Sequence, residues 1–161
     1  MDAEEKSVAN KVKPIPDGYH SITPYLTVTG AAKLIDFLKQ AFDATETERM
    51  MRPDGTVHHA ELQIGDSKVM MGECAPPRLP MPSMLYLYVP DVDTTYGRAI
   101  EAGAKSIMEP ADQFYGDRHG GVEDPSGNQW FIATHIEDVA PEEMKRRAEA
   151  AAQKATGSTS S

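Results

Sequence analysis

His59 and Glu61 are two side chains suited to acid–base or metal chemistry, and they stand two positions apart. They lie in the segment Val57 to Ile64, whose alternation of apolar and polar residues predicts a half-buried strand. Residues two apart on a strand share a face. The pair could therefore hold a divalent cation with one more donor. Alternatively, Glu61 could act as a general base if burial beside tyrosines raises its pKa. A simpler interpretation is a hydrogen-bonded polar pair that lines a wet cleft.

A second polar group runs from Tyr115 to His119. The planar guanidinium of Arg118 could clamp a carboxylate or phosphonate, and His119 titrates near neutral pH. The structural alternative is that Asp117 and Arg118 pair and brace a loop.

The elements that must position these residues occur twice in the chain. Tyr25-Leu26-Thr27-Val28 is followed 61 positions later by Tyr86-Leu87-Tyr88-Val89 (86 − 25 = 61). The same offset carries Gly55 onto Gly116 and His58 onto His119. A repeat of this size cannot cover its own apolar face, so two copies must pack together.

Each copy is predicted to be a β-α-β-β-β module, the first over residues 21–75 and the second over residues 83–139. In the first module, Thr29 is expected to cap a helix that runs from about Ala31 to Phe42. Residues 76–82 hold four prolines and are the expected linker.

The two ends of the chain differ from the modules in composition. Residues 1–20 mix charges with prolines and are expected to be a flexible leader. Residues 140–161 are expected to form a C-terminal helix followed by a polar tail, because they are rich in Ala, Glu, Lys and Arg.

Composition excludes several classes of function. The chain has 161 residues, with 16 basic and 25 acidic side chains and a net charge of −9, which argues against nucleic acids and anionic membranes as partners. No apolar run approaches the ~20 residues that span a bilayer, and no signal segment is visible, so a cytoplasmic location is expected. A single cysteine, Cys74, excludes an internal disulfide bond.

Several short strings occur in a characteristic order. They are Ser21-Ile22-Thr23-Pro24-Tyr25-Leu26, His59-Ala60-Glu61-Leu62, Tyr115-Gly116-Asp117-Arg118, Asp124-Pro125-Ser126-Gly127-Asn128-Gln129-Trp130 and Ile132-Ala133-Thr134-His135. Together they resemble the vicinal oxygen chelate superfamily, which includes glyoxalase I, bleomycin-resistance proteins, fosfomycin-resistance enzymes and extradiol dioxygenases. Within it, they look like the PhnB-like subgroup. The resemblance spans about residues 21–147.

This resemblance implies an α+β fold with eight strands in a curled, open mixed sheet around a concave cleft, and often a homodimer. It also implies four metal ligands in the metal-using members. Those positions fall here on Thr23, Met70 or Met71, Met84 and Phe131. None is a usual ligand of a hard or borderline divalent cation, so no metal is expected at the usual site. A displaced metal would use His59 and Glu61.

We therefore predict a protein that binds a small molecule in the cleft between the modules, without the usual metal. The side chains expected to line that cleft are Tyr25, Thr27, His59, Glu61, Tyr86, Tyr88, Arg118 and Phe131. One alternative is a metal-dependent lyase, isomerase or dioxygenase with its metal at His59 and Glu61. Another is a regulatory or scaffold protein without a ligand of its own.

Overall fold

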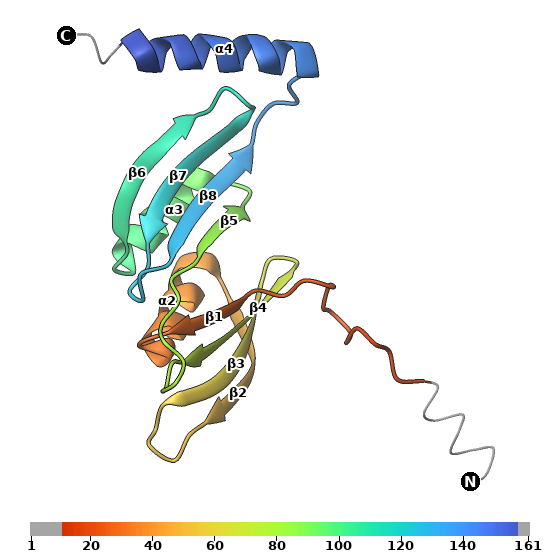
Figure 1. Ribbon diagram of the computed structural model, residues 1–161, viewed down its shortest axis with the longest axis vertical. Helices are drawn as coiled ribbons and strands as arrows, with labels where there is room; N and C mark the ends of the chain where they lie inside the picture. Colours follow the sequence, from red (N-terminus) through yellow and green to blue (C-terminus); the bar gives the residue numbers. More distant parts are fainter. Residues whose placement is uncertain (1–10, 158–161) are drawn as a thin grey trace.

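The structure is a computed structural model that describes residues 11–157. Two β-α-β-β-β modules follow one another along the chain (Figure 1). The first contains β1 (Tyr25–Val28), α2 (Ala31–Phe42), β2 (Thr45–Met51), β3 (Val57–Ile64) and β4 (Ser67–Glu73). The second contains β5 (Met84–Tyr88), α3 (Val92–Glu101), β6 (Lys105–Asp112), β7 (Asp117–Glu123) and β8 (Gln129–His135), and α4 (Pro141–Gly157) follows it. The predicted α+β fold of two modules is confirmed.

The eight strands form two separate four-stranded sheets, whereas one continuous curled sheet was expected. Their orders are β1-β4-β3-β2 and β5-β8-β7-β6. In each, the first two strands are parallel and the other neighbours are antiparallel. Helix α2 of the first module packs against α3 of the second, and this contact joins the two modules (Figure 1).

The modules share one hydrophobic core through these helices. Phe42 at the end of α2 lies against Trp130 of β8, with ring centroids 5.0 Å apart. Arg98 of α3 donates to both carboxylate oxygens of Asp43, at 2.8 and 2.6 Å. Since apolar and ionic contacts both cross the boundary, the two modules form a single packed unit.

Each sheet has one face covered by a helix and one open face. In β3, Ala60, Leu62 and Ile64 are buried, while the intervening His59 and Glu61 are half-buried. The period of two therefore sends the apolar side chains to α2 and the polar ones to the open face. The second sheet is built in the same way, with α3 behind β7 (Figure 1).

The start of α2 differs from the expected cap. Gly30, with φ of 81°, is the cap residue, and the carboxylate of Glu73 accepts hydrogen bonds from the backbone of Gly30 and Ala31 at 2.7–3.1 Å. A positive φ is cheap only for glycine. The parallel pairing of β1 with β4 brings Glu73 to the helix N-terminus, so the role assigned to Thr29 was wrong.

A buried carboxylate organises the turn that precedes β8. Asp124, only 4% exposed, accepts bonds from the backbone of Ser126 and Asn128 and from the Asn128 amide and the Trp130 indole. The turn therefore fixes the core tryptophan as well as the chain direction.

The last helix, α4, buries no side chain and crosses the end of the second module (Figure 1). Arg147 attaches it to Glu137 through an ion pair of 2.7 Å, and it also pairs at 3.0 Å with Glu143 of the same helix. In the described part of the chain, no helix is long and apolar enough to cross a membrane. Residues 1–10 of the expected leader and residues 158–161 of the expected tail lie outside the described residues.

Candidate functional site

A hollow of about 640 Å³ opens on the first sheet, and we call it the basic hollow. It is lined by Tyr25, Thr27, Met50, Arg52, His58, His59, Gly72, Glu73 and Arg78. Tyr25, Thr27 and His59 were predicted to line a ligand cleft. Arg52 and Arg78 were not, because one lies in a hairpin and the other in the linker.

One aromatic pair forms the floor of the basic hollow. The rings of Tyr25 and His59 are stacked with centroids 5.6 Å apart, and Tyr25 Oη is hydrogen-bonded to His59 Nδ1 at 3.2 Å. Gly72 makes room for them. A Cβ there would lie 2.9 Å from Tyr25 Oη and 2.6 Å from the carbonyl oxygen of His58. The absence of a side chain at residue 72 therefore allows the tyrosine to lie flat against the sheet.

Two arginines bring positive charge to this hollow. Arg52 donates to the Glu73 carbonyl oxygen at 3.0 Å and to Thr56 Oγ1 at 3.3 Å. The linker follows β1 because the Met81 amide donates to the carbonyl oxygen of Thr27 at 2.9 Å, and this path brings Arg78 to the hollow. Within residues 11–157, no carboxylate forms an ion pair with either guanidinium.

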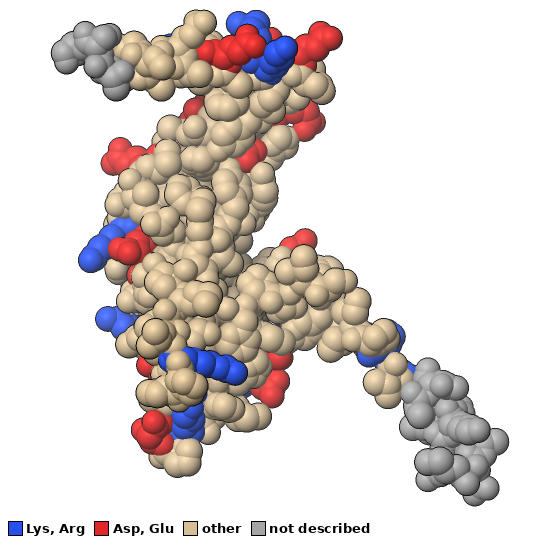
Figure 2. Space-filling view, viewed as in Figure 1, with Lys and Arg blue, Asp and Glu red and all other residues tan. Residues whose placement is uncertain are grey.

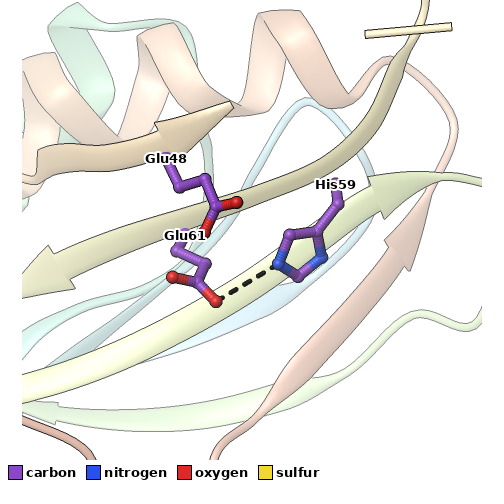
Figure 3. Close-up of side chains that lie close together, drawn as sticks. All are labelled: Glu48, His59 and Glu61. Carbon is purple, nitrogen blue, oxygen red and sulfur yellow. Dashed lines mark hydrogen bonds and ion pairs between the residues drawn. The ribbon is translucent and has the colours of Figure 1, made fainter. Parts of the chain in front are cut away.

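Three potential metal ligands meet beside the basic hollow. One donor atom each from Glu48, His59 and Glu61 lies within 4.8 Å of the others (Figure 3). His59 Nε2 is 3.3 Å from Glu61 Oε1, and Glu48 is the cross-strand partner of Glu61. Sequence reasoning found the pair on β3 but missed Glu48. The register of the hairpin formed by β2 and β3 would have been needed to find it.

Burial was expected to raise the pKa of Glu61, and this expectation is wrong. The nearby Tyr19 hydroxyl stabilises the ionised form, and His59 adds to this, so the pKa of the Glu61 carboxyl is lowered despite partial burial. Burial raises the pKa of Tyr19 to about 12, and the neighbouring Glu61 carboxylate adds to that shift. The Tyr19 hydroxyl is nevertheless without a hydrogen-bond partner of standard geometry among the described residues.

The open face of the second sheet carries a buried carboxylate network. Asp117, 3% exposed, accepts from the hydroxyls of Tyr86 and Tyr88 at 2.9 and 2.8 Å, and it pairs with His135 Nδ1 at 2.8 Å. Burial opposes ionisation of Asp117. The hydrogen bonds from His135, Tyr88 and Tyr86 outweigh burial and lower its pKa. The network therefore holds a carboxylate that already has three partners.

His119 stands in the same face among aromatic rings. Its Nδ1 is 2.7 Å from Tyr115 Oη and 3.1 Å from Tyr86 Oη, and its ring lies 5.7 Å from that of Phe131. Burial lowers the pKa of His119, although the charge of Asp117 opposes the shift. The imidazole is therefore favoured in its neutral form.

Arg118 was expected to line the ligand cleft, but its side chain pairs with acidic residues elsewhere. Its guanidinium donates to both carboxylate oxygens of Asp93 on α3, at 2.8 and 3.0 Å, and to Asp112 at 3.1 Å. These contacts place Arg118 on the helix-covered face, because it alternates along β7 with Asp117 and His119. Arg118 thus braces α3 against the sheet rather than lining an open cleft, and its partner is not Asp117.

The residues predicted to line one cleft are divided between two faces. Tyr86 and Tyr88 help to line a groove of about 600 Å³ between the modules, which also includes Phe42 and Arg98. Phe131 contacts His119, as Tyr86 also does. A single chain therefore does not bring Tyr25, Thr27 and His59 together with Tyr86 and Tyr88.

The positions that correspond to the superfamily's usual metal ligands offer unsuitable groups. Met71 is fully buried in the core, Met84 is exposed, and Phe131 has no donor atom. Met70 faces Tyr25 and Glu61 across the strands, but a thioether is a soft ligand. These residues do not fit a hard or borderline divalent cation.

Comparison with known proteins agrees with this fold. The model of the Glyoxalase/Bleomycin resistance protein/Dioxygenase superfamily matches residues 18–132. The chain belongs to this superfamily. The match covers both modules, including β1, β3, β5, β7 and most of β8.

The curated relatives have no described activity. The chain is 36% identical over 136 residues to the uncharacterised protein Mb0911c of Mycobacterium bovis, covering 78% of this chain and 90% of that protein. It is equally similar to the uncharacterised protein Rv0887c of Mycobacterium tuberculosis, covering 80% of that protein.

Solved structures share the fold at low sequence identity. TioX from Micromonospora sp. ML1 has a TM-score of 0.62 and 24% identity, over 73% of this chain and 99% of that one. A glyoxalase/bleomycin resistance protein/dioxygenase family enzyme from Burkholderia phytofirmans PsJN has a TM-score of 0.58 and 19% identity, over 71% and 97%. At this identity, the likeness concerns architecture alone.

Proposed function

We propose that this protein binds a small organic anion in the basic hollow, without a metal at the superfamily's usual positions. The observation that supports this function is a hollow of about 640 Å³ whose lining includes two arginines, two histidines and a tyrosine. Ligand pockets commonly measure ~300–1,000 Å³. The hollow is therefore large enough for a metabolite-sized ligand.

Local charge favours an anion. The chain as a whole carries a net charge of −9. Two arginines without an ion-pair partner therefore make the local charge of the hollow more positive than that of the chain as a whole. Glu73 is the only acidic residue that lines the hollow, and its carboxylate already binds the N-terminus of α2. Arg52 and Arg78 thus remain to bind a carboxylate, phosphate or phosphonate, and a guanidinium can do so through two parallel hydrogen bonds.

The apolar part of the ligand is assigned to Tyr25. Tyr25 is 42% exposed, and the exposed Met50 lines the same hollow. A flat ring next to cationic groups suits a planar or unsaturated anion. In the proposal, Tyr25 supplies apolar contact area while the two arginines orient the charged end.

We also propose that two copies form a homodimer. The side chains of Met84, Tyr86 and Tyr88 are 40–66% exposed on β5, and such apolar groups commonly mark an interaction surface. Size-exclusion chromatography with light scattering tests this: twice the mass of one chain is expected. A monomer at concentrations well above those in the cell would contradict the dimer.

The finer family placement and the excluded partners also stay proposals. The strings quoted above favour the PhnB-like subgroup. In the view of Figure 2, Lys and Arg side chains are scattered among acidic ones without a continuous basic surface. That pattern supports the prediction that nucleic acids are not partners.

Titration calorimetry with phenylphosphonate, benzoate and inorganic phosphate tests the binding function. We expect at least one of them to bind, and Arg78→Ala to weaken that binding about tenfold or more by removing a charge-assisted hydrogen bond. The control is Arg146→Ala, because Arg146 is 71% exposed on α4 and remote from the hollow. The proposal is wrong if none of these anions binds, or if both variants bind them as the wild type does.

A further inference from the structure

We propose that Glu48, His59 and Glu61 bind a divalent transition-metal ion on the open face of the first sheet (Figure 3). This site lies on β2 and β3, whereas the positions that the superfamily resemblance implies precede β1 or lie on β4, β5 and β8. It goes beyond the proposed binding of an anion. The two sites share only His59, which lines the basic hollow as well.

A bulge in β2 turns Glu48 toward the site. The register shifts between Glu46 and Glu48, so that Glu46 lies opposite Leu62 and Glu48 lies opposite Glu61. Glu46 then pairs with Lys39 of α2 at 3.7 Å and with Arg49 at 2.7 Å. Bulges re-aim side chains in this way. The consequence is that Glu46 of β2 is neutralised by two cations, while the carboxylate of Glu48 lies beside that of Glu61.

A buried hydroxyl without a well-formed hydrogen bond points to the same place. Tyr19 Oη is the only buried side-chain nitrogen or oxygen atom within residues 11–157 that lacks a hydrogen-bond partner. It lies near Glu61, and Lys68 Nζ lies 5.4 Å from the centre of its ring. Leaving a buried hydroxyl without a good hydrogen bond destabilises the folded chain. A metal-bound water beside Glu61 would give this hydroxyl a hydrogen-bond partner of good geometry, in addition to the nearby Glu61 carboxylate.

His59 is already oriented as a metal-ligating histidine is. Its Nδ1 is hydrogen-bonded to Tyr25 Oη at 3.2 Å, and its Nε2 points toward Glu61. When Nδ1 carries the proton and donates it to the tyrosine oxygen, the lone pair of Nε2 is free for an ion. Metal-binding histidines commonly have their other ring nitrogen fixed by such an outer partner.

The donor set defines the class of ion. One imidazole nitrogen and two carboxylates suit Zn²⁺, Mn²⁺, Fe²⁺, Co²⁺ or Ni²⁺, and three protein ligands leave at least one position for water. Glu48 is exposed, whereas His59 and Glu61 are half-buried, so solvent reaches the ion from the side of β2. Ca²⁺ and Mg²⁺ are less suited, because both prefer a full set of oxygen ligands.

Calorimetric titration of the untagged, chelator-treated chain with Zn²⁺ and with Mn²⁺ tests the site. We expect one ion per chain for at least one of these metals. Glu48→Gln and His59→Gln should each weaken binding tenfold or more. Tyr25→Phe should weaken it about tenfold by releasing the ring of His59. Circular dichroism confirms that each variant is folded before it is titrated.

Two matched controls locate the ion. Glu46→Gln removes a charge from the same strand, and His58→Gln removes the neighbouring imidazole, so both should bind the metal as the wild type does. The inference is overturned if neither metal binds, or if a control weakens binding as much as Glu48→Gln or His59→Gln does. Glu48 does not line the basic hollow, so a failure of this site is distinguishable from a failure of anion binding.

Discussion

Tyr25 and His59 are hydrogen-bonded at 3.2 Å and stacked, although 34 positions separate them in the chain. The second module repeats the contact, because Tyr86 Oη lies 3.1 Å from Nδ1 of His119, 33 positions further on. The structural counterpart of His119 is therefore His59 (119 − 59 = 60), whereas the offset of 61 had selected His58. A difference of one residue sends a strand side chain to the other face, so the correct pairing matters to the chemistry.

The two equivalent tyrosines are expected to differ in their effect on stability. Tyr25→Phe removes one hydrogen bond on an exposed face and should cost ~0.5–1 kcal/mol of the free energy of unfolding. Tyr86→Phe removes a hydroxyl that donates to the buried carboxylate of Asp117, so it should cost ~1.5–3 kcal/mol. Urea denaturation monitored by circular dichroism measures both values.

Tyr88→Phe extends the comparison, because Tyr88 donates to the same oxygen of Asp117 but is 61% exposed. Its loss of free energy of unfolding should lie between those of Tyr25→Phe and Tyr86→Phe. Equal losses for Tyr25→Phe and Tyr86→Phe would show that the Asp117 network contributes no more than a surface hydrogen bond.

His119 and His135 are expected to change the pH dependence of stability in opposite directions. Burial lowers the folded-state pKa of His119, so the unfolded chain takes up the proton first. The free energy of unfolding therefore falls as the pH drops below about 6.5. Asp117 and then Asp138 raise the pKa of His135. Its contribution is fully present below about pH 6.5 and is lost as the pH rises through the raised folded pKa.

Two substitutions separate these effects. The measured quantity is the free energy of unfolding at about pH 5.5 minus that at about pH 8. Relative to the wild type, His119→Gln should raise this difference and His135→Gln should lower it. Denaturation curves at the two pH values give the differences. Shifts of the same sign in both variants would contradict the assigned environments.

Two glycines related by the repeat offer a test of local crowding. Gly55 and Gly116 both have positive φ, 87° and 96°. A Cβ at Gly55 would meet open space, so Gly55→Ala should cost only the ~1–2 kcal/mol of a left-handed alanine. A Cβ at Gly116 would collide with the carbonyl oxygen of Glu137, so Gly116→Ala should cost ~2 kcal/mol more. Thermal unfolding compares them, and equal losses would rule out the collision.

Much of the fold was predictable because it follows from local pattern. Alternation in 57–64 and helical spacing in 31–42 identified β3 and α2 at their observed bounds. The repeat identified two modules, and the resemblance identified the superfamily that the comparison shows. The cap of α2 could not be found in this way, since Glu73 is 42 positions away from Ala31 and reaches it only through the pairing of β1 with β4.

The candidate site depended more heavily on tertiary structure. The sequence by itself determined that His59 and Glu61 share a strand face, because side-chain alternation is a local property of the backbone. Only the tertiary structure brought Glu48, Tyr19 and Arg78 to that face and sent Arg118 to α3. The physical reason is that strand register, a bulge in β2 and the packing of α2 on α3 arise from contacts between distant segments, which no local pattern of residues encodes.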